Sequence, residues 1–202
     1  MARILILFAH PAFEKSRVHK AMVKQIPRID GITFHDLYES YPDFDIDLDR
    51  EQTLLLQHDV IVFQHPFYWY SCPPILKQWM DLVLEHGWAY GRGGTNLSGK
   101  ILFNAITAGG REEVYQESGY NRFTVKQLLA PFDQTAHLCK MLYLPPFVIH
   151  DTHRLNTNGI ELHALQYQQL LVGFHNDTIS LNELEHVKYL NDIVPVPLAL
   201  KN

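Results

Sequence analysis

The stretch RILILFA at residues 3–9, followed directly by His10 and Pro11, decides the fold. Its last six residues are apolar without interruption, which is the pattern of a β-strand buried on both faces of a parallel sheet. Proline has no backbone N–H to donate to a sheet, so the strand is predicted to end at His10. The chain therefore opens with a central strand, and a loop begins at its carboxyl end.

Four further apolar segments follow, and amphipathic segments separate them. Strands are predicted at residues 32–36, 60–65, 100–107 and 147–150. Helices are predicted at residues 16–26, from 49, from 73, across 125–139 with a break at Pro131, and at 160–174. Five strands alternating with helices form a doubly wound, three-layer α/β/α sandwich. With right-handed crossovers we expect a parallel sheet in the order 2-1-3-4-5.

Length, charge and cysteine content narrow the class of protein. The 202 residues suffice for one domain, and the net charge of −5, with lysine and arginine scattered, argues against nucleic acid as a partner. Cys72 and Cys139 form no metal or disulfide motif, so we expect a cytoplasmic protein. No apolar run is long enough to cross a bilayer. His150 and His153 have no third ligand beside them, so no metal site is predicted.

In the order 2-1-3-4-5, a ligand crevice lies at the carboxyl ends of strands one and three. The loop after strand one leads into a helix at Ser16, and free N–H groups at a helix start attract anions. Ser16 adds a hydroxyl and Arg17 a positive charge. The loop could therefore bind a phosphate, or Ser16 could be an ordinary N-cap on a solvated loop.

The loop after strand three reads PFYWYSCPP at residues 66–74 and holds four consecutive aromatic residues. A regular element alternates its faces, so we expect one or two of these rings to be exposed. Exposed rings beside a cleft suit a flat aromatic ligand or a subunit interface, and both readings stay open. After strand four, TAGG at residues 107–110 could let the backbone approach a ligand closely or form a simple turn.

Several of these segments together resemble the flavodoxin-like NAD(P)H:quinone oxidoreductase family. The matching blocks are AHP at 9–11, HPFYWYSCPP at 65–74, KQWMD at 77–81, WAYGRGGT at 88–95 and TAGG at 107–110. YPDFDID at 41–47 and HGWAYG at 86–91 look most like the ancillary subunits of bacterial glutathione-regulated potassium-efflux systems. The resemblance predicts a flavodoxin-like FMN-binding domain at residues 1–174 and leaves a C-terminal extension of unknown role at 175–202.

The resemblance implies tightly bound FMN, reduced by NAD(P)H and reoxidised by a quinone in a ping-pong hydride transfer. The FMN phosphate would meet the first loop and the start of the following helix, at His10, Ser16, Arg17, Val18 and His19. Its isoalloxazine ring would lie against the aromatic loop and the glycine turn, at Phe67, Tyr68, Trp69, Tyr70, Thr107, Ala108, Gly109 and Gly110. Family members are homodimers with the site at the interface, which would merge the two readings of the aromatic loop.

One position departs from the family. Mammalian-type quinone reductases use a tyrosine and a histidine six residues later to steady charge at the flavin and the quinone. The tyrosine matches Tyr115, whereas the histidine position holds Asn121, which cannot carry a proton. The alternative function is therefore a regulatory subunit that activates a potassium/proton antiporter with little quinone turnover. Such a subunit would lie at the cytoplasmic face of the membrane through its partner.

Overall fold

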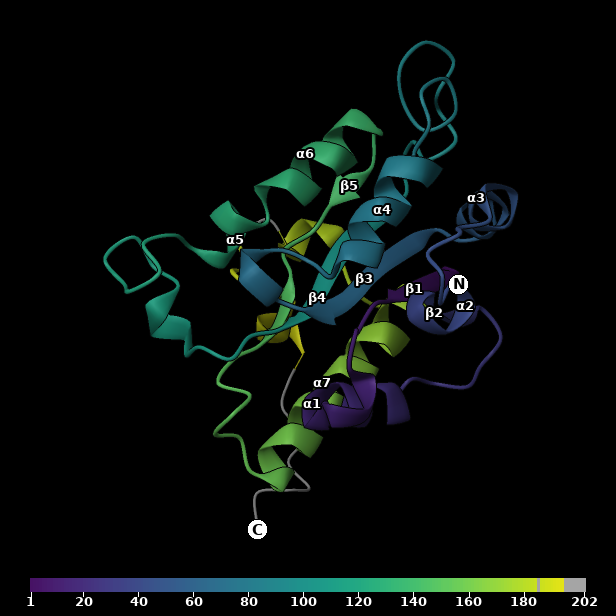
Figure 1. Ribbon diagram of the computed structural model, residues 1–202. Helices are drawn as coiled ribbons and strands as arrows, with labels where there is room; N and C mark the ends of the chain where they lie inside the picture. Colours follow the sequence, from purple (N-terminus) through teal and green to yellow (C-terminus); the bar gives the residue numbers. More distant parts are fainter. Residues whose placement is uncertain (185, 195–202) are drawn as a thin grey trace.

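A parallel sheet forms the middle layer of the computed structural model, which describes residues 1–184 and 186–194 (Figure 1). The strand order is β2-β1-β3-β4-β5, with β6 also paired to β4, so the predicted order is confirmed. The strands are β1 (Ile4–Phe8), β2 (Ile32–Asp36), β3 (Val60–Pro66), β4 (Ile101–Thr107), β5 (Leu142–Tyr143) and β6 (Phe147–Ile149). Part of the predicted extension, residues 185 and 195–202, lies outside the described residues.

The fifth strand differs from the prediction of one segment at residues 147–150. It is divided into β5 and β6, which pair with successive parts of β4: Leu102 opposite Tyr143, and Ala105 opposite Phe147. Pro145 and Pro146 lie between the two parts, and proline has no N–H for the ladder. The interruption therefore follows from backbone chemistry.

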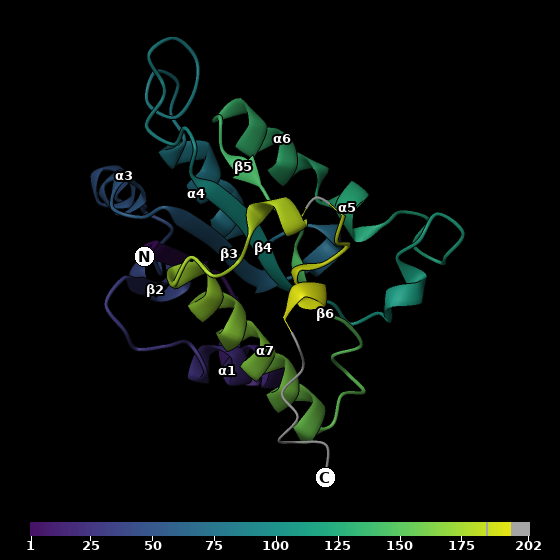
Figure 2. The ribbon, with the colours of Figure 1, turned by 180° about the vertical axis from the view of Figure 1, so that it is seen from behind.

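Helices cover both faces of the sheet (Figures 1 and 2). On one face, α1 (Arg17–Lys24) packs along α7 (Thr157–His175). The other face is covered by α3 (Leu48–Leu56), α4 (Pro74–Val83), α5 (Val125–Leu128) and α6 (Ala130–Leu138), and a short α2 (Leu37–Ser40) follows β2. None of the helices within residues 1–184 and 186–194 has both the length and the apolar content of a membrane span.

Two of the predicted helix boundaries can be checked directly. The predicted break at Pro131 is confirmed, because α5 ends at Leu128 and α6 begins at Ala130. The predicted start at Asp49 is wrong by two residues: the Asp47 carboxylate caps the helix by accepting the Arg50 N–H at 3.0 Å. Asp47 and Asp49 both have a side chain that can cap a helix, and in the structure Asp47 occupies the N-cap position.

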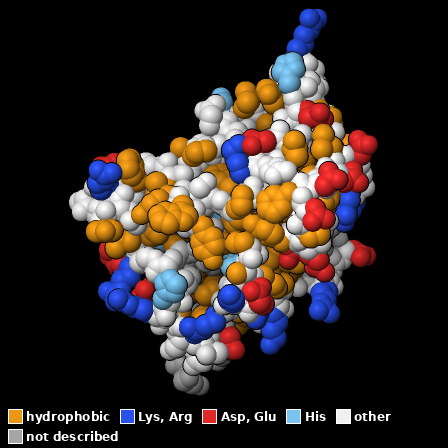
Figure 3. Space-filling view, viewed as in Figure 1, with side chains coloured by type: hydrophobic (Ala, Val, Ile, Leu, Met, Phe, Trp, Pro, Cys, Tyr) orange, Lys and Arg blue, Asp and Glu red, His pale blue; other side chains and the backbone are white. Residues whose placement is uncertain are grey.

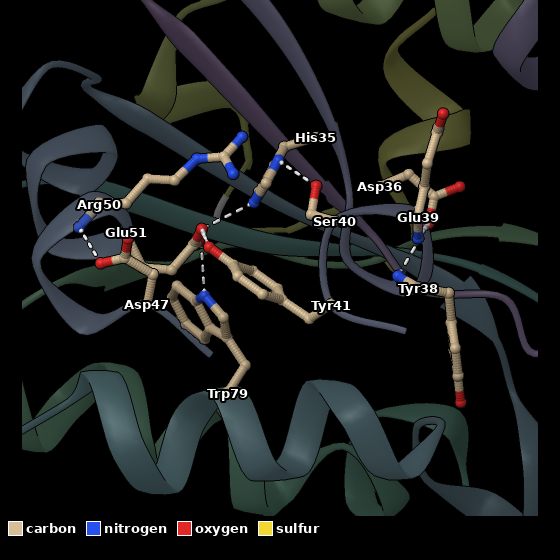
Figure 4. Close-up of polar contacts among 10 residues, drawn as sticks. All are labelled: His35, Asp36, Tyr38, Glu39, Ser40, Tyr41, Asp47, Arg50, Glu51 and Trp79. Atoms are coloured by element: carbon tan, nitrogen blue, oxygen red, sulfur yellow. Dashed lines mark hydrogen bonds and ion pairs between the residues drawn. The ribbon is translucent and has the colours of Figure 1, made fainter. Parts of the chain in front are cut away.

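A buried carboxylate joins β2, α3 and α4 on one side of the sheet (Figure 4). Glu51 is fully buried and accepts hydrogen bonds from His35 Nε2 at 2.8 Å, Tyr41 Oη at 2.6 Å and Trp79 Nε1 at 2.8 Å. Burial acts to raise the pKa of Glu51, but its hydrogen bonds, first that from His35, outweigh burial and lower the pKa. The network holds the loop that begins at Tyr41 against the core.

Replacing Glu51 with leucine should lower the free energy of unfolding by about 3–5 kcal/mol, because three buried donors lose their acceptor. Glu51→Gln keeps an acceptor oxygen of the same size and should cost clearly less. Urea unfolding followed by circular dichroism measures both values. Equal losses for the two variants would contradict this account of the network.

A second polar chain crosses the core between β3, β4 and β5. Tyr143 Oη donates to Asn104 Oδ1 at 2.6 Å, so the Asn104 amide nitrogen donates to His65 Nε2 at 3.0 Å. His65 Nδ1 then carries the ring proton and donates to the Pro66 carbonyl at 2.9 Å. Full burial lowers the pKa of His65 to about 4.

This histidine should make stability depend on pH. Between the ordinary histidine pKa of 6.5 and about 4, the unfolded chain binds a proton that folded His65 does not. The free energy of unfolding should therefore fall as pH falls through this window, by about 3 kcal/mol from His65 alone. Urea titrations at several pH values should show a shallower slope for His65→Gln, and an unchanged slope would argue against the assignment.

The extension folds back onto the free edge of β6. Asn191 places its side chain against Val148, accepting the Val148 N–H at 2.8 Å and donating to the Val148 carbonyl at 3.1 Å. Gln166 of α7 donates to the carbonyls of Asn191 at 2.8 Å and Val194 at 3.0 Å. The described end of the chain is thus fixed to both the sheet and its covering helix.

Candidate functional site

A cavity of about 360 Å³ opens at the carboxyl ends of β1, β3 and β4, at the edge where the strand order predicts a crevice. Its walls come from the loops after these strands and from the loop after β6. The lining residues are His10, Ala12, Lys15, Ser16, Arg17, Val18, Pro66, Phe67, Tyr68, Thr107, Gly109, Thr152 and His153. A larger cavity of about 550 Å³ lies between α5, α6 and the extension, and none of the predicted site residues lines it.

The start of α1 forms the first wall of the cavity. Ser16 Oγ accepts the His19 N–H at 3.2 Å, which confirms Ser16 as the N-cap. The N–H groups of Arg17 and Val18, the first two of the helix, have no partner within the helix. Arg17 Nη2 donates to the Leu155 carbonyl at 2.8 Å, so its guanidinium is held between the two loops. This wall therefore presents backbone donors and positive charge.

His10 lies beside the helix start, with its ring centroid 5.1 Å from that of His19. Its Nδ1 accepts the Ala12 N–H at 3.1 Å, so in the neutral ring the proton lies on Nε2. Burial is the largest influence on His10 and lowers its pKa, against the opposing charge of Glu14. His10 is thus a neutral N–H donor whose orientation the loop backbone fixes.

His19 lies beneath the cavity floor and does not line the cavity. Its Nε2 is 3.0 Å from Thr107 Oγ1, and its Nδ1 is 3.4 Å from Gln64 Nε2. Tyr167 Oη donates to Gln64 Oε1 at 3.0 Å, which leaves the Gln64 amide group to donate to His19 Nδ1. His19 therefore donates from Nε2 to Thr107. Burial, followed by the nearby His10 and His65, lowers its pKa well below 6.5.

The aromatic loop after β3 divides its rings between the core and the surface. Phe67 is buried, whereas Tyr68, Trp69 and Tyr70 are 47%, 93% and 45% exposed. Three rings are exposed, against the one or two expected. Trp69 and Tyr70 have φ of 49° and 64°, in the left-handed region that bulky residues rarely occupy. The strained turn presents the Trp69 ring to solvent beside the cavity.

The two glycines after β4 allow close approach of different neighbours. A Cβ on Gly109 would lie 2.8 Å from His153 Nε2, at the tip of an exposed side chain. A Cβ on Gly110 would lie 2.9 Å from Val114 Cγ2 and 3.2 Å from Tyr115 Cε2, inside the segment that folds back over it. Gly110 is thus needed for the packing of the loop that carries Tyr115.

Tyr115 and Asn121, the positions that the resemblance implies as catalytic, lie next to the cavity without lining it. Tyr115 is buried with its ring centroid 6.1 Å from that of Phe67. Burial is the largest cause of its raised pKa, and Tyr70 adds to it. Asn121 Oδ1 accepts the Tyr70 hydroxyl at 3.3 Å and so joins this loop to the aromatic loop. Both residues therefore contact the aromatic loop after β3.

Eight of the thirteen predicted cofactor-binding residues line the cavity. The other five lie beside or beneath it: His19, Trp69, Tyr70, Ala108 and Gly110. The prediction missed five lining residues: Ala12, Lys15, Pro66, Thr152 and His153. Thr152 and His153 follow the fifth strand, whose carboxyl end reaches the same edge as the other loops, so the topology could have indicated them although no motif marks them.

The fold and the cavity define a doubly wound α/β protein with a cavity at the topological switch point of its sheet. The chain belongs to the family described as flavodoxin-like fold, whose model matches residues 2–171. It is 42% identical over 172 residues to the glutathione-regulated potassium-efflux system ancillary protein KefG of Enterobacter sp. (strain 638), covering 85% of this chain and 94% of that one.

Solved structures give the same family assignment. General stress protein 14 of Treponema denticola, in complex with FMN, is 38% identical with a TM-score of 0.79, over 85% of this chain and 98% of that one. An NADPH-quinone reductase of P. pentosaceus is 34% identical with a TM-score of 0.75, over 83% and 96%. FMN binding and quinone reduction therefore occur among the relatives of this chain.

The two glycines should differ in their tolerance of alanine. Gly110→Ala should lower the free energy of unfolding by about 1–3 kcal/mol, since the added methyl group overlaps packed side chains. Gly109→Ala should change it by less than about 0.5 kcal/mol because the exposed His153 side chain can move aside. Urea unfolding of the pair measures the difference, and equal effects would contradict the packing described for Gly110.

Proposed function

We propose that the protein is an FMN-dependent NAD(P)H:quinone oxidoreductase that acts as a homodimer. The observation that carries the proposal is the cavity at the carboxyl ends of β1, β3 and β4, which brings together eight of the residues assigned to FMN from the sequence. The FMN complex of a 38% identical relative supports the choice of cofactor.

The donors around the cavity fit FMN. The N–H groups at the start of α1, the Arg17 guanidinium and the neutral His10 Nε2–H would hold the phosphate. Thr107 Oγ1 accepts a hydrogen bond from His19, which leaves its own O–H to donate toward the cavity. Phe67, Tyr68 and Gly109 would line the ring.

Bound FMN would supply hydride chemistry, accepting a hydride from NAD(P)H and passing it to a quinone in a ping-pong cycle. The chain's own residues would orient the reactants and exclude water from the ring. Tyr115 would supply a proton to the reduced acceptor, and Asn121 would hold Tyr70 in the aromatic loop through their hydrogen bond.

A homodimer would explain the exposed aromatic side chains around the site. Trp69 and Tyr120 are 93% and 91% exposed, and Tyr70 and Phe123 are close to half exposed. Figure 3 shows hydrophobic side chains gathered across the middle of the face that is viewed in Figure 1. A second copy seated over the aromatic loop would cover these rings and complete the pocket wall.

A second role is favoured by the KefG relative, of which the chain covers 94%. In this role the protein docks on the cytoplasmic side of a potassium/proton antiporter and raises its transport rate. Both roles can coexist, so the informative variant is one that loses the flavin.

The spectrum of the purified protein tests the enzyme proposal. We expect flavin absorbance that remains through gel filtration, and oxidation of NAD(P)H that depends on added quinone. Arg17→Ala should weaken FMN binding by about tenfold or more, since it removes a charge-assisted contact to the phosphate. Lys24→Ala, on the same helix but away from the lining, is the matched control.

A colourless protein that takes up no FMN would refute the enzyme proposal. The antiporter role is tested separately, by potassium efflux from cells that express the antiporter with wild-type protein or with Arg17→Ala. Efflux that is independent of this chain would exclude that role.

A further inference from the structure

The larger cavity, of about 550 Å³, follows the free edge of β5. It touches five consecutive residues, 142–146, of this edge strand and the turn after it. Side chains of a strand alternate between the two faces of a sheet, so a cavity that touches every residue in turn lies along the edge itself. One side of the cavity is formed by α5 and α6, and the other by the extension, which leads away from α7 in yellow in Figure 2. We refer to this cavity as the edge groove.

The backbone of Tyr143 turns its hydrogen-bonding groups away from the sheet. The Leu142 N–H donates to the Lys100 carbonyl at 2.8 Å, and the Leu144 N–H donates to the Leu102 carbonyl at 2.9 Å. Successive residues of a strand direct their backbone groups to opposite sides, so the N–H and C=O of Tyr143 point away from β4. In the described part of the chain neither group has a hydrogen-bond partner.

At β6 the same edge shows how such groups are satisfied. Val148 also faces away from β4, and the side-chain amide of Asn191 accepts its N–H at 2.8 Å and donates to its carbonyl at 3.1 Å. The Asn191 amide thus takes the place of a peptide group from a neighbouring strand. Tyr143 offers the same donor and acceptor, and no such amide faces it from residues 1–184 or 186–194, so a peptide in the edge groove would fit it.

The walls of the edge groove suit apolar side chains beside such a peptide. Its volume lies within the range of about 300–1,000 Å³ that is usual for ligand sites. Because helices stand on one side of the edge and the extension on the other, a single extended segment can enter, whereas the edge of a second folded sheet cannot. The apolar lining residues come from both sides and from the strand: Val125, Leu129, Leu142, Leu144, Pro145, Pro146, Leu181, Leu184 and Val187.

Two charged side chains define which segment would fit best. Lys126 of α5 and Asp133 of α6 line the edge groove, and neither has an ion-pair partner among the described residues. Lys188, on the opposite side, is already paired with Glu112 at 2.6 Å. A segment with one acidic and one basic side chain therefore complements the two unpaired charges.

We propose that the edge groove binds an extended segment of a partner protein, which adds to β5 as a short strand. One residue of the segment exchanges hydrogen bonds with the N–H and C=O of Tyr143, and its apolar neighbours fill the groove. An acidic and a basic side chain face Lys126 and Asp133. The site is separate from the proposed enzyme activity, because none of the residues assigned to FMN lines the groove. The extension, which follows the family match ending at residue 171, supplies one wall.

A library of random heptapeptides displayed on phage tests the proposal. Selection on the full-length, FMN-loaded protein should yield binders with alternating apolar residues. In the strongest binder, made as a synthetic peptide, the amide nitrogens are methylated one at a time. At least one methylation should weaken binding by about tenfold or more while methylation of the adjacent amides changes it little, because only alternate amides of an added strand face β5.

Two pairs of variants locate the bound peptide. Leu181→Asp places a charge in the wall and should weaken binding by about tenfold or more. Leu138→Asp, at an exposed leucine of α6 outside the lining, is the matched control and should leave binding unchanged. Tyr143→Pro removes the N–H, at an edge position where proline is tolerated, and should weaken binding more than Tyr143→Ala, which keeps the N–H.

Hydrogen exchange provides a measurement that needs no substitution. The Tyr143 amide should exchange rapidly in the protein alone and about tenfold or more slowly with saturating peptide. The Leu142 amide, already bonded to Lys100, should change little.

The proposal is overturned if selection yields no peptide, if no single methylation weakens binding, or if Leu181→Asp leaves binding unchanged. Slow exchange at Tyr143 without peptide would also overturn it. If fast exchange then returns when residues 195–202 are removed, or on dilution, the occupant is the chain's own end or a second copy.

Discussion

The hydrogen bonds of the neutral His19 ring join the parts of the structure on which the site depends. The ring belongs to α1, receives a hydrogen bond from Gln64 of β3 and donates one to Thr107 at the end of β4. Tyr167 of α7 fixes the orientation of Gln64 from below. A protonated ring would turn an N–H toward the Gln64 amide donor, so burial and hydrogen bonding both require the uncharged form.

The sheet provides the rigid base for this arrangement. Every residue of β1 and β3 is buried, and both faces of the sheet are covered by helices. Rigid strands allow their loops to hold unfavourable conformations, and the left-handed backbone at Trp69 and Tyr70 is an example. Phe67 anchors that turn in the core, so the backbone strain is confined to Trp69 and Tyr70 at the surface.

Features that depend on neighbours in the sequence could be predicted, and those that depend on distant neighbours could not. The strand order, the Ser16 cap and the break at Pro131 follow from apolar periodicity and backbone chemistry. The resemblance assigns His19 to the cofactor, and the structure places its side chain in the core against Thr107, which no local pattern indicates. Thr152 and His153 carry no motif and reach the cavity only through the topology of the sheet.

The side chain of Asn191 has a consequence for how the protein associates with other chains. It occupies the backbone groups of Val148 that an added strand would need, at the edge of the sheet formed by β6. Exposed strand edges invite edge-to-edge pairing and open-ended aggregation. Because Asn191 occupies the edge at β6, a second chain cannot extend the sheet there by adding a strand. Contacts with another chain at β6 must therefore be made through helices and loops, which do not propagate into a growing sheet.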